Sequence, residues 1–113
     1  MQLTVTPRED SWHVQTSGAI DDTARELFRE ELHPRLLTPG ARMVLDLSGS
    51  SYVNSQGLGH LVTLVTHANT KGASLVFCGL QPHVAGVVSV TKLDRLFTIE
   101  PNADQAFARL AGG

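Results

Sequence analysis

Several features are scarce or absent in this chain of 113 residues, which has one cysteine and a formal net charge of −2. The single Cys78 cannot form a disulfide within the chain, and its position in the apolar run SLVFCGL predicts a buried core side chain. Lys and Arg are spread without a basic run, so no nucleic-acid partner is expected and a protein partner is favoured.

Segments that would direct the chain to a membrane are also missing from the sequence. No stretch is long and apolar enough to cross a bilayer, and the N-terminal MQLTVTPRED lacks a basic start followed by an apolar region. We therefore expect a cytoplasmic location and no membrane partner. The length fits a single domain over residues 1–113 with one core.

The apolar pattern predicts strands that alternate with helices. LTVT and SWHVQTSG each alternate apolar and polar residues around a charged turn, which predicts a hairpin ending at Gly18. The apolar runs RMVLDL and ASLVFCGL predict central strands buried on both faces. Between them a helical pattern runs from Leu58 to Ala68 and stops near Lys71 and Gly72. A strand, a helix and a strand in this order predict a right-handed crossover and a parallel pair.

The other segments predict the rest of the fold. DDTARELFREEL reads as an amphipathic helix that Pro34 interrupts before a short segment RLL. QPHVAGVVSV is ambiguous, because Pro82 suits a first helical turn while the valines favour a strand; a short helix is favoured. RLFTIE predicts a last strand. NADQAFARL predicts a final helix with Asn102 as N-cap and with Ala106, Phe107 and Leu110 facing inward.

The stretch SYVNSQGLGHL places an exposed serine, Ser55, where a strand hands over to a helix. Three roles are open for it: a nucleophile, a part of a phosphate cradle, or a site that is itself modified. The nucleophile motif G-x-S-x-G lacks its first glycine, because that position is Val53, so a hydrolase is not favoured.

Nucleotide and metal sites are weakly supported. GLGHLV begins like a dinucleotide-binding motif, but Val62 replaces the third glycine and no G-K-[ST] follows. His60 and His67 share a helical face without a cysteine or carboxylate to complete a metal site, so both are expected at the surface. We expect no cofactor and no metal.

Modification of Ser55 remains. A phosphate there would lie at the N-terminus of a helix beginning near Gln56, where free N–H groups and the helix dipole favour negative charge. From Met43 to Thr70 the only formally charged residue is Asp46, so a nearly neutral surface would gain about −1.5 to −2 charges. The alternative is that Asn54 or Ser55 only caps the helix and the glycines only permit close packing.

The order of these motifs resembles the STAS domain family, and within it the bacterial anti-sigma factor antagonists. The family has a strand ending in D-L-S and then D-S-[ST]-G-L-G at a helix start, and this chain reads LDLSGSSYVNSQGLG. Gly18, Ile20 and Asp21 match an earlier G-x-[LI]-D element, and KLDRLFTI approximates a later one.

The resemblance implies an α/β fold of the STAS type, with a mostly parallel central sheet opened by an antiparallel strand and helices mainly on one face. It also implies a partner switch without catalysis. The unphosphorylated protein would bind a serine-kinase anti-sigma factor, the kinase would phosphorylate Ser55 and separate the complex, and a PP2C-type phosphatase would reset it. The partner-binding residues implied are Gly18, Asp21, Asn54, Gln56, Gly57, Leu58, Gly59, His60 and Thr63.

Two positions depart from the family pattern. Asn54 replaces the aspartate before the serine, and Gln56 replaces Ser or Thr after it. A second class therefore stays open, a STAS domain that binds as a scaffold or as a regulatory subunit of a transporter and is never phosphorylated. For Gly57 and Gly59 we expect a role in the close approach of a partner, with little effect on stability.

Overall fold

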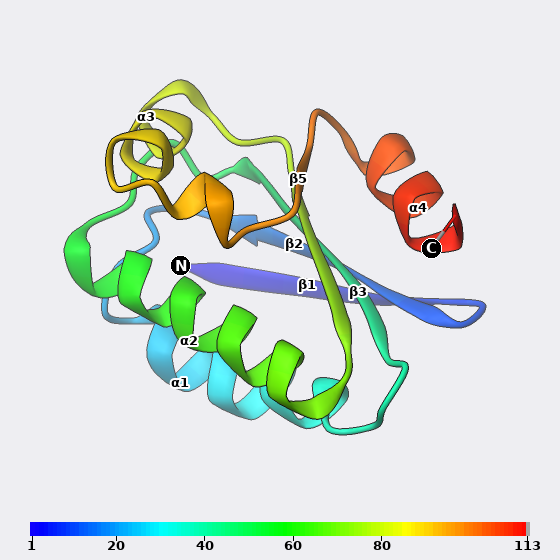
Figure 1. Cartoon of the computed structure of the whole chain (residues 1–113). Coiled ribbons are helices and arrows are strands. Elements are labelled where there is room, and N and C mark those ends of the chain that lie inside the picture. The colour runs from blue at the N-terminus through cyan, green and yellow to red at the C-terminus, as the bar shows by residue number, and fades with distance from the viewer. Residues whose placement is uncertain (113) are drawn as a thin grey trace.

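A five-stranded sheet forms the centre of the protein, whose computed structural model describes residues 1–112 (Figure 1). The strands lie in the order β1-β2-β3-β4-β5; β1 pairs antiparallel with β2, and the other neighbours are parallel. The elements in chain order are β1 (Gln2–Arg8), β2 (Ser11–Ser17), α1 (Ala24–Leu27), η1 (Phe28–Leu32), η2 (His33–Leu36), β3 (Arg42–Gly49), α2 (Ser55–Lys71), β4 (Ser74–Cys78), α3 (Pro82–Val90), η3 (Leu93–Arg95), β5 (Ile99–Glu100) and α4 (Ala103–Gly112). This architecture confirms the predicted fold class.

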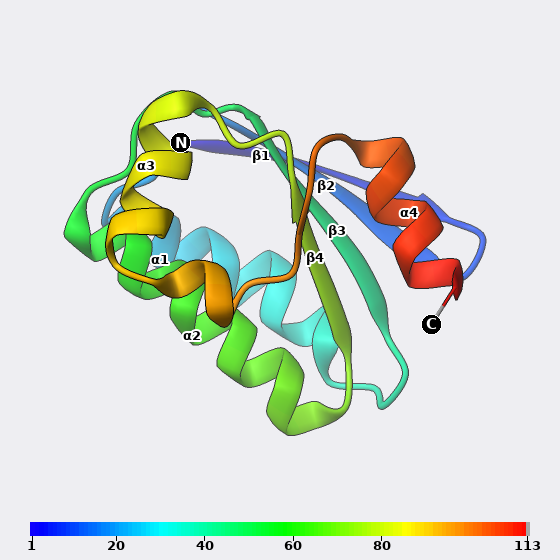
Figure 2. The same ribbon diagram turned by 45° about the horizontal axis from the view of Figure 1, so that its top comes forward.

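Helices cover both faces of the sheet, unequally. The segment from α1 to η2, together with α2 and α3, packs on one face over the larger core, whereas α4 alone covers the other (Figure 2). The smaller cluster consists of Val44, Val76, Cys78, Ala106 and Leu110. Val44 and Leu45 are adjacent in β3 and belong to different clusters, since successive side chains of a strand point to opposite faces.

Most of the predicted elements are confirmed. The hairpin, the two central parallel strands and the connecting helix lie where the apolar pattern placed them, and Gly72 takes the left-handed conformation at the end of α2 with φ 73°. The ambiguous segment forms helix α3, with Pro82 in its first turn. Cys78 is buried, and burial raises the pKa of its thiol to about 12, with a further contribution from Asp46.

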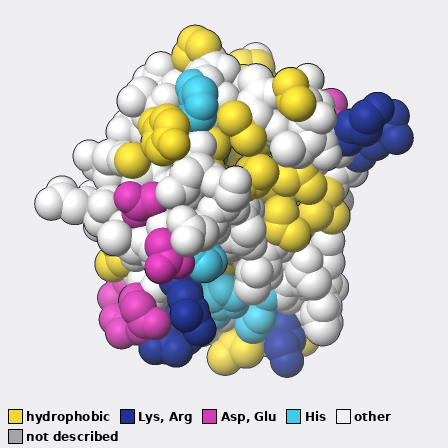
Figure 3. Space-filling model, turned by 90° about the vertical axis from the view of Figure 1, so that its left-hand side faces the viewer, with side chains coloured by type: hydrophobic (Ala, Val, Ile, Leu, Met, Phe, Trp, Pro, Cys, Tyr) yellow, Lys and Arg dark blue, Asp and Glu magenta, His cyan; other side chains and the backbone are white. Residues whose placement is uncertain are grey.

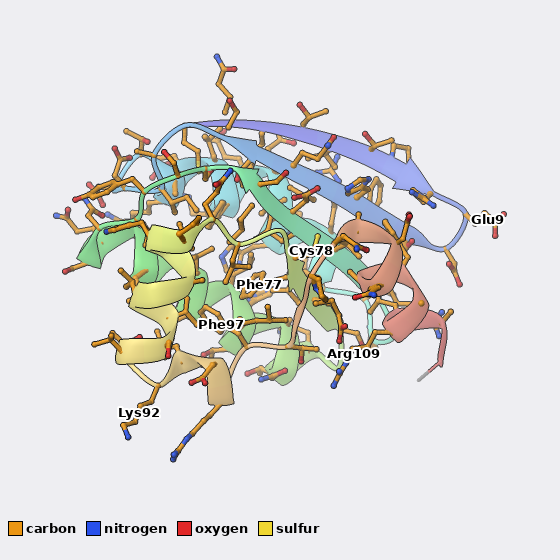
Figure 4. All side chains as sticks on the ribbon, turned by 90° about the horizontal axis from the view of Figure 1, so that it is seen from above. Glu9, Phe77, Cys78, Lys92, Phe97 and Arg109 are labelled. Carbon is orange, nitrogen blue, oxygen red and sulfur yellow. The ribbon has the colours of Figure 1, made fainter. Side chains whose placement is uncertain are left out.

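Two predictions about extent need correction. RLFTIE is not one strand, because Leu93–Arg95 forms a 3-10 turn and only Ile99–Glu100 pairs with β4. Phe97 instead turns inward against Phe77, with ring centroids 4.6 Å apart, as the labelled side chains show (Figure 4). The second correction concerns the first helix, which was expected to be interrupted at Pro34 before a separate segment RLL. Instead, the helical segment continues to Leu36 and changes from α to π to 3-10 geometry, and Pro34, which lacks an N–H, lies in the 3-10 part.

Candidate phosphorylation and partner-binding site

The N-terminus of α2 is fixed by Asn54. This residue has extended backbone angles, φ −103° and ψ 179°, and its side-chain oxygen accepts a hydrogen bond from the Gly57 N–H at 2.8 Å. Asn54 is therefore the N-cap, and it satisfies one of the amide groups that a helix start leaves without a partner. Of the two capping residues left open by the sequence, the structure selects Asn54.

Ser55 is the first residue of α2, and its side chain is exposed. No hydrogen bond of its hydroxyl is found among residues 1–112. The helix begins one residue earlier than the predicted start near Gln56. Because the neighbouring residue makes the cap, the Ser55 hydroxyl is left available to a reagent or a partner.

The loop between β2 and α1 lies directly against this helix start. The Ile20 N–H donates to the Tyr52 carbonyl at 2.9 Å, the Asn54 N–H donates to the Ile20 carbonyl at 3.1 Å, and Ile20 and Val53 form an isolated parallel bridge. Ile20 itself is fully buried. The segment that carries Asp21 and the segment that carries Ser55 are thus held together by backbone bonds that do not involve Ser55.

The two glycines of the motif have different roles. A Cβ at Gly57 would lie 1.9 Å from the Ile20 carbonyl oxygen, whereas a Cβ at Gly59 would meet no atom within 4 Å. Two residues along an α-helix are about 200° apart around its axis, so both cannot face a partner. The expected role of Gly57 in the approach of a partner, with little effect on stability, is therefore wrong; Gly57 lets α2 pack against the Ile20 segment.

The surface of Gly59 is continuous with that of Ser55. Ser55, Gly59 and Thr63 recur every fourth residue along α2, and all three are exposed. The Thr63 hydroxyl donates to the Gly59 carbonyl at 3.0 Å within the helix. This exposed stripe of small side chains leaves α2 accessible for two turns after Ser55.

Charged groups do lie near the site, although the sequence window from Met43 to Thr70 suggested an almost neutral surface. The loop after β2 brings Asp21 and Asp22 beside the helix start. Asp22 contacts His60 at 3.1 Å between Oδ1 and Nε2. Hydrogen bonds from the Thr23 hydroxyl and N–H lower the pKa of Asp21, so this carboxylate stays ionised.

The other predicted site residues lie around this centre in different settings. Gly18 has a positive φ of 90° and its N–H donates to the Gly49 carbonyl at 3.0 Å, which ties the end of β2 to that of β3. Gln56 is exposed, and its side-chain oxygen lies 3.5 Å from the Asn54 amide nitrogen. Leu58 is half-buried against the core.

Two residues at this end were not predicted from the sequence. Tyr52 is 48% exposed, and its ring stacks on that of His83 with centroids 4.8 Å apart. His83 Nδ1 accepts a hydrogen bond from the Val53 N–H at 3.4 Å. The carboxyl ends of neighbouring parallel strands meet at one edge of a sheet, so the placement of His83 just after β4 could have indicated this contact. Figure 3 shows the end of the molecule at α3 and the start of α2, with apolar side chains gathered on its upper part, most charged ones below and a Lys or Arg side chain at the upper right edge.

Within residues 1–112, no group of three or more His, Cys, Asp or Glu side chains could hold a metal ion. Over the same residues, no helix combines the length and the apolar character needed to cross a membrane.

The family model of the STAS domain matches residues 2–106, and the chain belongs to this family. A STAS-domain-containing protein of Pseudomonas aeruginosa (strain UCBPP-PA14) is 30% identical over 101 residues, which cover 88% of this chain and 99% of that protein. A Bordetella bronchiseptica protein named "Putative anti-sigma factor antagonist BtrV" is 25% identical over 108 residues, covering 96% and 93% of the two chains.

Solved structures share the fold. RsbS of Moorella thermoacetica, in a serine-to-glutamate variant, has a TM-score of 0.83 at 22% identity and covers 99% of this chain and 97% of that one. The anti-sigma factor antagonist SpoIIAA in its unphosphorylated form has a TM-score of 0.79 at 14% identity, with 99% and 98% covered. At these identities, the likeness establishes the fold.

Proposed function

We propose that this protein is an anti-sigma factor antagonist that acts in a partner switch controlled by Ser55. Unphosphorylated, it binds a serine-kinase anti-sigma factor in the cytoplasm and thereby regulates transcription; phosphorylation of Ser55 ends the binding, and a PP2C-type phosphatase restores it. The domain performs no catalysis itself. The observation that carries the proposal is the exposed Ser55 hydroxyl at the first position of α2, left free because Asn54 makes the cap.

The same geometry gives the phosphate a physical consequence. The phosphate would sit at the N-terminus of a 17-residue helix, where the helix dipole favours negative charge, so the fold would tolerate it. For a docked partner, the surface would gain about −1.5 to −2 charges beside the carboxylates of Asp21 and Asp22. A partner surface fitted to the uncharged Ser55 would then meet a concentrated negative charge.

The names of two similar proteins support the proposed function. One is named as an anti-sigma factor antagonist, and SpoIIAA has been solved in its unphosphorylated form. We propose that Gly18, Asp21, Asn54, Gln56, Leu58, Gly59, His60 and Thr63 line or shape the contact around Ser55. Gly57 would contribute through packing.

The test is intact mass and phosphosite mapping of the protein purified from its own cells. We expect a species with one added phosphoryl group, located on Ser55. In parallel, Ser55→Ala and Ser55→Asp variants would serve as baits for the serine-kinase partner. Ser55→Ala should retain the partner and Ser55→Asp should lose it. Equal capture by both, with no phosphate on Ser55, would contradict the switch.

A second candidate is a STAS module that only binds, and Asn54 is the observation that favours it. The family pattern has a carboxylate at this position, and here the side chain is a neutral amide used as a cap. Asn54→Asp should keep the cap, because both side chains serve as N-caps. A phosphorylation time course with the cognate kinase compares the two. We expect transfer to the wild type and faster transfer to Asn54→Asp, since a carboxylate that holds the acceptor serine or is recognised by the kinase outweighs one screened charge. Transfer to the variant alone would identify a binding module.

A further inference from the structure

The outer edge of β1 is open over the whole strand. β1 spans Gln2–Arg8 and pairs with β2 alone among the strands of residues 1–112, so its other side has no strand beside it. Seen from above, β1 forms the margin of the ribbon farthest from α2 (Figure 4). An unpaired strand edge presents backbone N–H and C=O groups that can bind another strand.

The hairpin register identifies which residues present these groups. Glu9 and Asp10 form a two-residue turn closed by the pair Arg8 and Ser11, which exchanges backbone hydrogen bonds in such hairpins. Hydrogen-bonded pairs alternate along an antiparallel ladder, so the backbone N–H and C=O groups of Arg8, and of every second residue before it, point toward β2. Those of Leu3, Val5 and Pro7 point outward, away from the sheet, except that Pro7 has no N–H. Pro7 agrees independently, because a proline inside a strand is tolerated where its missing N–H would face away from the ladder.

The two edges of the sheet differ in protection. The edge at β5 consists of Ile99–Glu100 only and is followed by Pro101, which are two ordinary ways to prevent edge pairing. The first part of β1 reads QLTVT and contains no charged side chain and no proline. Pro7 is the first residue of β1 that would oppose edge pairing. The backbone of the residues before it therefore remains available to pair with another strand.

We propose that β1 pairs antiparallel with β1 of a second copy of this chain, around a two-fold axis at Thr4, to form one continuous ten-stranded sheet across a homodimer. In this register the outward backbone groups of Leu3 bond those of Val5 in the second copy, and the reverse, while Pro7 stays outside the central pairing. The occupant is a second copy because the edge is complementary to itself: Leu3 faces Val5, Thr4 faces Thr4, and no like charges meet.

The side chains support the same arrangement. Leu3 and Val5 are half-buried and pack against the larger core from the edge, so a neighbouring strand would cover the apolar surface they still expose. Thr4 is exposed on the opposite face. The contact is a single strand pair, which predicts a weak dimer with a concentration-dependent population. The antiparallel two-fold would place the two Ser55 residues at opposite ends of the dimer, so partner binding and dimerisation would be independent.

Sedimentation equilibrium over a hundredfold range of concentration tests the proposal with the full chain. We expect the wild type to dimerise and both Thr4→Lys and Thr4→Glu to remain monomeric, because each places two like charges opposite one another across the axis. An equimolar mixture of the two variants should dimerise again as the heterodimer. Gln15→Lys is the matched control, since Gln15 is exposed and lies beside Thr4, one strand in from the edge.

A monomeric wild type over the whole range would overturn the proposal. So would dimers of Thr4→Lys as strong as those of the wild type, a mixture that fails to reassociate, or a loss in Gln15→Lys as large as that in Thr4→Lys. Circular dichroism melts identify any variant that fails to fold. If Thr4→Lys unfolds, Thr4→Glu alone against the wild type decides the question by the same loss of dimer.

Discussion

Two strand-to-helix junctions at the same edge of the sheet differ in how they are fixed. Between β3 and α2, the Asn54 side chain caps the helix and Gly57 allows contact with the Ile20 carbonyl. Between β4 and α3, Gln81 occupies the N-cap position but makes no capping bond with its side chain. Its side-chain amide instead donates to the carbonyl of Ser48 at 2.7 Å, near the end of β3 where the first junction begins.

The difference indicates a division of roles. The first junction holds its backbone through contacts that leave the Ser55 side chain free, whereas the second contributes its own polar side chains to support the first. Gln81 bonds Ser48, and His83 accepts the Val53 N–H. A site that presents one reactive side chain benefits from a backbone held by its neighbours. Substitutions can separate the two roles, beginning with the largest expected effect.

Gly57→Ala should destabilise the fold by about 3 kcal/mol, because the new methyl group would overlap a backbone carbonyl that cannot move without breaking the Ile20 contacts. Gly59→Ala is the matched control at an open position, where alanine should add about 1 kcal/mol of stability as a better helix former. Urea unfolding of both variants measures the difference. Equal stability of Gly57→Ala and Gly59→Ala would mean that close packing of Gly57 against the Ile20 backbone does not stabilise the start of α2.

Ser50→Ala should cost about 1–3 kcal/mol, because the buried Ser50 and Thr16 hydroxyls bond each other at 2.6 Å and the change leaves Thr16 without that partner. This bond lies at the beginning of the loop that leads to Ser55. Ser51→Ala, at an exposed neighbouring position, is the control and should change stability little. The free energies of unfolding compare the pair, and similar values for both would contradict a structural role for the buried bond.

The sequence predicted the elements that depend on repeated apolar side chains and missed the contacts that depend on a third segment. RMVLDL and the helical pattern after it located β3 and α2, because periodicity records which face is buried. Gly57 looked like Gly59 in the sequence, since nothing there shows that the Ile20 carbonyl fills the space beside one of them. The 200° separation around the helix was the available signal that the two had different roles.

Isolated local signals gave less reliable boundaries. RLFTIE has the apolar content of a strand, but tertiary packing directs Phe97 onto Phe77 and leaves only its last two residues to pair. The charge around Ser55 was misjudged for a similar reason, because Asp21 and Asp22 come from a loop far away in sequence. The exposure of Ser55 at the start of a helix was predictable from one short stretch, since a serine between an asparagine and glycines needs no distant partner to be exposed.

Asn54→Ala should cost about 1 kcal/mol through loss of the cap to the Gly57 N–H. Gln81→Ala should cost less, about 0.5 kcal/mol, because it removes an exposed bond to Ser48 and no capping bond. Thermal melts of the two variants rank the junctions directly. A larger loss for Gln81→Ala than for Asn54→Ala would reverse the comparison and make the second junction the one that fixes the loop.

Ser55→Ala should have the smallest effect on stability, within about 0.5 kcal/mol of the wild type, because Ser55 is exposed and does not make the cap. Ser55→Asp should be slightly more stable than Ser55→Ala, by about 0.3–1 kcal/mol, since a carboxylate in the first helical turn interacts favourably with the helix dipole. That gain should decrease with added salt, which screens an exposed charge. Urea titrations at low and high salt measure both effects. A loss of 1 kcal/mol or more in Ser55→Ala would mean that the Ser55 hydroxyl, and not Asn54 alone, holds the start of α2, so that phosphorylation would disturb the fold as well as the partner.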